Sequence, residues 1–152
     1  MLIENFKMHF DAHEELACTA PCSMYSVLLQ HGLIKDPFDG LNELELTKLS
    51  EKDCRFEASF WVDDAMFANK HQRLTFYGLD TICAISLNGK PLAKTMNMHR
   101  SYAFELKGLL QQGENTLTLE FASPMRYSRA GKCRPFGEGS VFSQFAGLHR
   151  TF

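Results

Sequence analysis

The sequence predicts an all-β domain, an antiparallel β-sandwich with one short helix near residues 23–31. Three observations lead to this fold class. Residues 54–62 alternate between apolar and polar side chains, which is the period of a half-buried strand. Asn88-Gly89 joins two strand-like segments, and this pair tolerates the positive φ angles of a tight hairpin turn. Several other short alternating segments are separated by turn residues, as is typical of sandwiches.

The helix is the first element that the sequence predicts clearly. Ser23 is a suitable N-cap, apolar side chains follow it at helical spacing, and Gly32 can take the left-handed position after the last turn. Residues 33–49 are then expected to form an irregular connection, because they contain the turn-forming pairs Asp36-Pro37 and Asp39-Gly40.

The sheet is expected to begin with residues 54–62. This strand places its even-numbered residues, from Phe56 to Val62, on one face and Trp61 on the other. The remaining predicted strands span residues 72–77, 81–87, 101–106 and 115–121.

Length and composition predict a single domain over residues 1–152. Hydrophobic residues make up 45% of the chain and charged residues 22%, which is ordinary for a globular protein. A net charge of -2 gives no general attraction to phosphate backbones, so nucleic acid is not an expected partner. The apolar runs are too short for a membrane span and the N-terminus lacks the features of a signal peptide, so a cytoplasmic location is expected.

The cysteines do not predict a disulfide framework or a metal site. There are five of them, and an odd number without a signal peptide is more typical of buried thiols. Cys18 and Cys22 are separated by three residues, whereas zinc knuckles use a gap of two. The six histidines are scattered along the chain. We therefore expect no metal and no cofactor.

Four segments, taken in order, carry a family resemblance. Residues 20–38 contain Ala-Pro-Cys-Ser-Met-Tyr-Ser-Val-Leu-Leu and Gly-Leu-Ile-Lys-Asp-Pro-Phe, and Asn42-Glu43 follows. Gly-Leu-Asp-Thr lies at residues 78–81, Leu-Asn-Gly at 87–89 and Asn-Met-His-Arg-Ser-Tyr at 97–102. In this order and spacing, the segments resemble the N-terminal part of the β-mannosidases of glycoside hydrolase family 2, and together they cover most of the chain.

The resemblance implies the sugar-binding domain of a longer multidomain glycosidase, a jelly roll of the galactose-binding type. It implies no catalytic residue in this chain. In that family a separate barrel domain supplies both carboxyl groups of retaining hydrolysis, the nucleophile and the acid/base. Asn42-Glu43 only mimics the Asn-Glu pair of the barrel. The implied partner is the catalytic barrel, in cis or in trans, and carbohydrate is a further candidate partner.

One departure from the family concerns contact with sugar. The family usually carries Phe-Gly-Trp-Asp-Trp-Gly-Pro before its last strand, whereas residues 139–145 of this chain contain neither Trp nor Asp. A direct contribution to the mannose subsite is therefore not implied. Trp61 is the candidate for stacking on a sugar ring, because sugar C–H faces pack on aromatic rings. Packing between the sheets or at an interface is the alternative role of Trp61.

Three functions follow as alternatives. The preferred one is the accessory sandwich of a β-mannosidase-like hydrolase, whose barrel would hydrolyse terminal β-linked mannose or a related sugar. The others are a free-standing carbohydrate-binding module and a docking domain for a separate catalytic chain. The candidate residues for the interface or the rim of the sugar site lie in the family-like loops and are Asp36, Asn42, Asn97 and Arg100. Asp36 and Asn97 could instead close turns through hydrogen bonds to the backbone, and Arg100 could pair with a local carboxylate.

Overall fold

The computed structural model describes residues 1–106, 108–127 and 145–147, which form two layers of antiparallel strands. The larger layer is a six-stranded sheet with the order β2-β1-β4-β10-β7-β8. Its strands are β1 (Asn5–Phe10), β2 (His13–Thr19), β4 (Cys54–Val62), β7 (Ile82–Leu87), β8 (Lys90–Thr95) and β10 (Gly113–Ala122).

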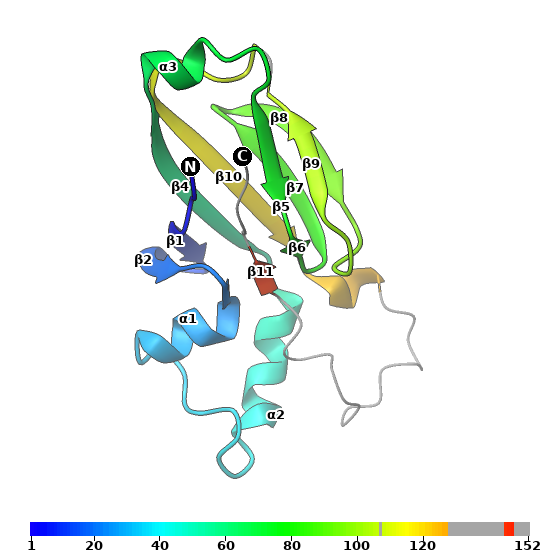
Figure 1. The fold of residues 1–152 in the computed structure, drawn as a ribbon. Coiled ribbons are helices and arrows are strands. Elements are labelled where there is room, and N and C mark those ends of the chain that lie inside the picture. Colours follow the sequence, from blue (N-terminus) through cyan, green and yellow to red (C-terminus); the bar gives the residue numbers. More distant parts are fainter. Residues whose placement is uncertain (107, 128–144, 148–152) are drawn as a thin grey trace.

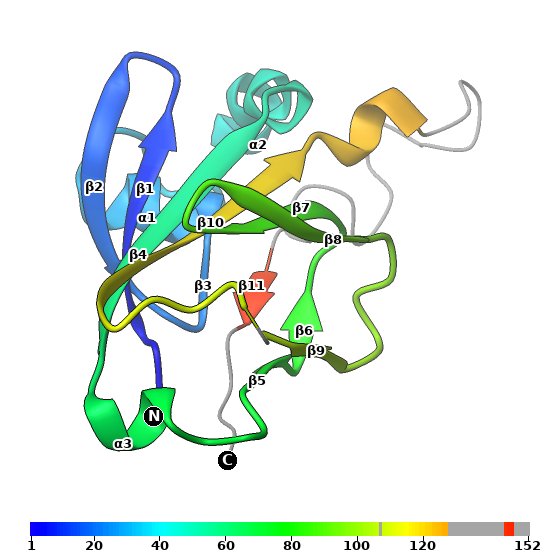
Figure 2. The ribbon, with the colours of Figure 1, turned by 90° about the horizontal axis from the view of Figure 1, so that it is seen from above.

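The second layer consists of shorter strands. Figure 2 shows them on one side of the long strands. They are β5 (Arg73–Phe76) paired with β9 (Tyr102–Glu105), and β3 (Cys22–Ser23), β11 (Phe145–Gly147) and β6 (Gly78–Leu79) in a three-stranded sheet. Two packed layers of antiparallel strands make a β-sandwich, so the predicted fold class is confirmed.

The core lies between the layers and follows the register of the large sheet. Met8, Phe56, Leu119 and Ile85 are partners across β1, β4, β10 and β7, and all four are buried. Phe76 of the second layer is fully buried against them. Since side chains alternate between the faces of a strand, this register places a continuous apolar row on one face of the sheet.

The hairpin around Asn88-Gly89 is confirmed. Both residues have positive φ, 52° for Asn88 and 73° for Gly89, as a tight turn between β7 and β8 requires. Asn88 also ties the turn to β10, because its Oδ1 accepts a hydrogen bond from the N–H of Thr116 at 2.9 Å. The alternation in β4 is confirmed as well, with Phe56 buried and Trp61 exposed.

The sheet begins earlier than predicted. β1 and β2 precede β4 and form its neighbouring hairpin, with a turn at Asp11 that has a φ of 55°. β2 lies at the edge of the sheet and is mostly exposed, so its sequence lacks the apolar alternation of a central strand. This exposure explains why the sequence pattern did not reveal it.

The predicted helix is α1 (Met24–Gln30). Ser23 and Ser26 form reciprocal caps at its start, and Gly32 follows its end with a φ of 67°. The connection predicted as irregular also contains α2 (Asn42–Leu46), followed by the 3-10 helix η1 (Thr47–Glu51). Leu46 is buried in the core, so tertiary packing stabilises a helix that its short sequence does not favour.

Two short helical elements complete the fold, α3 (Asp64–Phe67) and η2 (Pro124–Tyr127). Figure 1 shows α3 at one end of the sandwich, and α1 and α2 beyond the opposite end. We call these the α3 end and the helical end. In the described part of the chain, no helix is long and apolar enough to span a membrane.

Candidate functional site

The segment from the end of α1 to the first residue of α2, at the helical end, contains two of the predicted site residues, Asp36 and Asn42. The Oδ1 of Asp36 accepts a hydrogen bond from the N–H of Phe38 at 2.9 Å. The Nδ2 of Asn42 donates to the backbone carbonyl of Asp36 at 2.9 Å. Both side chains therefore hold the loop in shape, and the residue that they present to solvent is Phe38.

Apolar side chains are exposed in this loop. Phe38 is 82% exposed and Leu41 is 76% exposed, whereas Pro37 is buried. Exposed large apolar side chains that form a contiguous patch are typical of surfaces that contact another protein. The loop is thus shaped by polar side chains and presents apolar ones.

The other two predicted site residues lie in the connection between β8 and β9, residues 96–101. The Oδ1 of Asn97 accepts a hydrogen bond from the N–H of His99 at 2.8 Å, which closes a turn. The guanidinium carbon of Arg100 lies 5.1 Å from the centre of the Tyr102 ring, so Arg100 makes a cation–π contact. Within the described residues no carboxylate forms an ion pair with Arg100. No hydrogen bond among them joins Asp36 or Asn42 to this connection.

Trp61 lies apart from these four residues, next to the α3 end. It precedes the last residue of β4 and is 68% exposed on the outer face of the sheet. Its ring covers Gly113, where a Cβ atom would lie 3.6 Å from the Cη2 of Trp61. The structure therefore separates the aromatic candidate from the polar ones.

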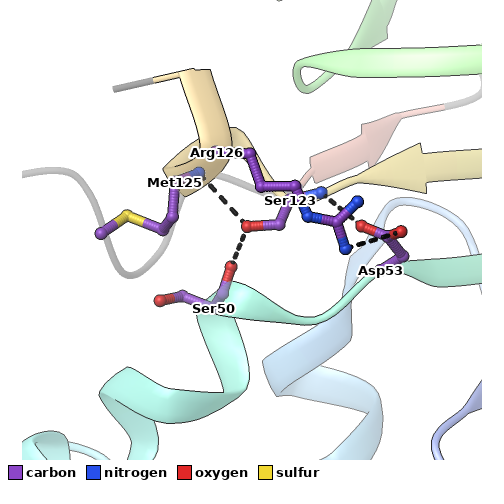
Figure 3. A network of polar contacts seen from close by, with 5 residues as sticks. All are labelled: Ser50, Asp53, Ser123, Met125 and Arg126. Carbon is purple, nitrogen blue, oxygen red and sulfur yellow. Dashed lines mark hydrogen bonds and ion pairs between the residues drawn. The ribbon is translucent and has the colours of Figure 1, made fainter. Parts of the chain in front are cut away.

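A polar network fixes the end of β10 beside η1. The buried Oγ of Ser123 donates to the carbonyl of Ser50 at 2.6 Å and accepts from the N–H of Met125 at 3.2 Å (Figure 3). The N–H of Ser123 donates to the Oδ1 of Asp53 at 2.8 Å, and the other oxygen of Asp53 pairs with Arg126 at 3.0 Å. The network connects β10 to the helical end.

Two buried ionisable side chains at the helical end, Tyr25 and Cys54, are held in their neutral forms. Burial raises the pKa of Tyr25 to about 12, although a hydrogen bond with Ser50 opposes the shift. Burial likewise raises the pKa of Cys54 to about 12, which makes its thiolate unavailable at neutral pH. Cys18, Cys22, Cys54 and Cys83 are all buried free thiols. Among the described residues, no three His, Cys, Asp or Glu side chains are grouped closely enough to hold a metal ion.

A hollow at the α3 end was not predicted from the sequence. It has a volume of about 590 Å³ and opens to solvent. We call it the α3 hollow. The residues that line it are Phe67, Asn69, Lys70, His71, Gln72, Gly108 and Leu110. They come from two connections far apart in the chain, one before β5 and one before β10, so no local sequence motif could have revealed it.

The departure from the family pattern at residues 139–145 falls outside the described residues except for the backbone of Phe145. That backbone belongs to β11, which pairs with β3 and β6. The expected loss of direct sugar contact in this segment therefore stays a prediction.

Comparisons with known proteins agree with the observed fold. The family described as glycosyl hydrolase 2 galactose-binding domain-like matches residues 5–141. The β-mannosidase of Mus musculus is 32% identical over 114 residues, which are 75% of this chain and 13% of the mouse enzyme. The β-mannosidase of Bos taurus is 29% identical over 125 residues, 82% of this chain and 14% of that enzyme.

Solved structures give the same result. The β-D-mannosidase of Dictyoglomus thermophilum superposes with a TM-score of 0.76 and 31% identity, over 91% of this chain and 18% of that one. The exo-chitosanase of Amycolatopsis orientalis superposes with a TM-score of 0.69 at 16% identity, over 80% of this chain and 16% of that one, which shows a shared fold alone. The chain spans less than a fifth of the length of these relatives. Since the family match covers most of its residues, the chain belongs to the glycosyl hydrolase 2 galactose-binding domain-like family.

Proposed function

We propose that this chain is the non-catalytic accessory sandwich of a β-mannosidase-like glycoside hydrolase. The observation that carries the proposal is that the similarity covers very different shares of this chain and of its relative. The similarity to the Dictyoglomus thermophilum β-D-mannosidase extends over 91% of this chain but over only 18% of the enzyme. Hydrolysis of terminal β-linked mannose, or of a related sugar, would then depend on a barrel outside these 152 residues, in cis or in trans.

The helical end is the surface that we assign to contact with the barrel. Phe38 and Leu41 supply exposed apolar area there, and Asp36 and Asn42 hold the loop that carries Phe38. Burying such side chains against a partner stabilises an interface by roughly 25 cal/mol per Å² of apolar surface before the costs of association. In this proposal Asp36 and Asn42 position the interface loop and do not themselves provide most of the binding free energy.

The connection at residues 96–101 extends the same surface. Met96 is 67% exposed, and the carbonyl of Met98 would lie 3.7 Å from a Cβ atom at Gly78, which places the connection beside β6 and away from α3. Asn97 and Arg100 shape this connection through the turn and the contact with Tyr102. They are therefore proposed as residues at the rim of the interface.

A complementation experiment tests the proposal. The Dictyoglomus thermophilum β-D-mannosidase, truncated to remove the region that matches this chain, is mixed with the purified chain, and hydrolysis of an aryl β-D-mannoside is measured. We expect no hydrolysis by the chain alone and restored or increased hydrolysis in the mixture. Hydrolysis by the chain alone would contradict a non-catalytic role.

Variants show whether the restored activity depends on the proposed surface. Phe38→Asp and Leu41→Asp place charges on side chains that are already exposed, so the chain should still fold while the activity of the mixture falls at least about tenfold. Trp61→Asp is the matched control, because it places the same charge on an exposed side chain near the opposite end. Equal losses from all three variants would argue against docking through the helical end.

A free-standing carbohydrate-binding module is the second candidate, and the α3 hollow is the observation that favours it. Such a module would bind sugar with full affinity in the absence of any barrel and would not restore activity to the truncated enzyme. The expected cytoplasmic location stays a prediction, which fractionation of the source cells would test.

A further inference from the structure

The α3 hollow has walls that are fixed by hydrogen bonds. The Nε2 of Gln72 donates to the carbonyl of Phe67 at 2.7 Å, which closes the first wall on the end of α3. The carbonyl of Gln72 accepts from the N–H of Leu106 at 2.7 Å, which joins the two walls. In the second wall, the carbonyl of Leu109 accepts from the Nδ2 of Asn88 at 3.0 Å. The hollow is therefore preformed, as small-ligand sites usually are.

Its lining combines apolar and polar groups. Phe67 is 44% exposed and lies in the hollow with Leu110, so one part of the lining is apolar. Asn69, Lys70 and His71 are exposed and supply hydrogen-bonding side chains. Within the described residues nothing donates a hydrogen bond to the Oε1 of Gln72, which remains an available acceptor.

This combination fits a sugar ring better than an inorganic anion. A pyranose presents C–H groups on one face, which pack on an aromatic ring, and hydroxyl groups at its edge, which both donate and accept hydrogen bonds. Amide and imidazole side chains can meet both requirements, whereas an anion would use the charge of Lys70 but would gain nothing from Phe67 and Leu110. The volume of about 590 Å³ lies within the usual range of small-molecule sites.

We propose that the α3 hollow is a carbohydrate subsite that takes one pyranose unit of an oligosaccharide, with Phe67 as the stacking platform. The choice of carbohydrate rests on the proposed function, but the site itself is separate from the proposed interface. It lies at the α3 end, so a barrel docked at the helical end would leave it open. The chain would then hold a substrate at a point away from the catalytic barrel.

Titration of the purified full chain with methyl β-D-mannopyranoside, followed by amide NMR shifts, tests the subsite. A ligand of this size at the usual affinity per atom gives an expected Kd of about 1 mM. The saturating shifts should fall on residues 67–72 and 108–110. Phe67→Ala should weaken binding about fivefold to tenfold, because it removes the stacking face.

Further variants keep the test decisive if Phe67→Ala alters folding. Asn69→Ala and His71→Ala remove exposed side chains and should each weaken binding about threefold without changing thermal stability. Phe38→Ala is the matched control, because it removes an exposed aromatic ring outside the hollow and should leave the Kd unchanged.

Several outcomes would overturn the subsite. They are the absence of saturable binding, weakening by Phe38→Ala as large as that by Phe67→Ala, and shifts in the hollow caused by inorganic phosphate but not by the mannoside. None of these outcomes affects the complementation experiment, in which no residue of the hollow takes part. A failure of the subsite can thus be distinguished from a failure of the accessory role.

Discussion

The two ends of the sandwich expose different chemistry. At the α3 end, the α3 hollow combines polar side chains with the apolar side chains of Phe67 and Leu110. At the helical end, polar side chains fold the loop internally and leave Phe38 and Leu41 exposed. A small hydroxylated ligand needs directed hydrogen bonds, whereas a protein partner provides a large apolar area to bury. Because its loops are grouped at opposite ends, one sandwich can present a hollow at one end and exposed apolar side chains at the other.

The ends also differ in how they are held. The buried amide of Asn115 holds the α3 end, because it bonds to Asn88 and to the backbone of Gln111 and Gly113. At the helical end the buried hydroxyl of Ser123 joins β10 to η1. An amide has more donors and acceptors than a hydroxyl, so more backbone groups depend on it.

Asn115→Ala should have the largest effect. It removes the hydrogen-bond partner of the N–H of Gln111, of two backbone carbonyls and of one N–H of the Asn88 amide, at a position that is 1% exposed. The expected loss in the free energy of unfolding is about 3 kcal/mol or more, measured by urea denaturation. Asn69→Ala, at an exposed position of the same end, is the control and should change stability little. A similarly small loss for Asn115→Ala would show that this amide does not hold the α3 end.

Ser123→Ala should have the next largest effect. It removes the donor to the carbonyl of Ser50 and the acceptor for the N–H of Met125 in a fully buried position, at an expected cost of about 1–3 kcal/mol. Asp53→Asn should cost less than about 1 kcal/mol, because its pair with Arg126 is half exposed and an amide oxygen can still accept from Ser123. Urea denaturation measures both losses in the free energy of unfolding. A larger loss for Asp53→Asn than for Ser123→Ala would show that the ion pair contributes more to the stability of this end than the hydroxyl of Ser123.

The smallest expected effect is on how stability depends on pH, through the ion pair of Lys52 and Asp11. The Nζ of Lys52 donates to the Oδ2 of Asp11 at 2.7 Å, and this hydrogen bond together with the charge of Lys52 lowers the pKa of Asp11. A carboxyl with a lowered pKa in the folded state stabilises the fold above its unfolded pKa of about 3.9, and the contribution is lost as pH falls through the folded pKa.

Lys52→Met should therefore return the pKa of Asp11 toward its ordinary value and flatten the acid limb of stability against pH. NMR titration of the Asp11 carboxyl measures the first effect, and urea denaturation below about pH 4 measures the second. Lys48→Met is the matched control, because Lys48 is also an exposed lysine of this end. A pKa of Asp11 that is the same in both variants would contradict the assignment.

The sequence predicted the parts of the fold that repeat a local pattern. The alternation in β4, the Asn88-Gly89 turn and the Ser23 cap each depend on a few neighbouring residues, and all three are confirmed. α2 was not predicted, because its stability comes from burying Leu46 in a core assembled from distant strands. Local sequence does not contain that information.

The same distinction applies to the candidate sites. Asp36, Asn42, Asn97 and Arg100 were named because they stand in recognisable loop motifs, and three of them hold those loops by hydrogen bonds while Arg100 contacts Tyr102. The α3 hollow could not be predicted, because it exists only where two connections distant in sequence meet. Sequence patterns thus identified the loops, whereas the cavity required the three-dimensional arrangement.

The position of β10 in the large sheet affects how the chain can fold during synthesis. β10 lies between β4 and β7, so it joins the part made of β1, β2 and β4 to the hairpin of β7 and β8. Until the ribosome has released residues 113–122, the inner edge of β4 has no partner and its apolar face is open to other chains. The large sheet is therefore complete only after β10 has left the ribosome, and a nascent chain that stops before β10 should be a preferred client of chaperones.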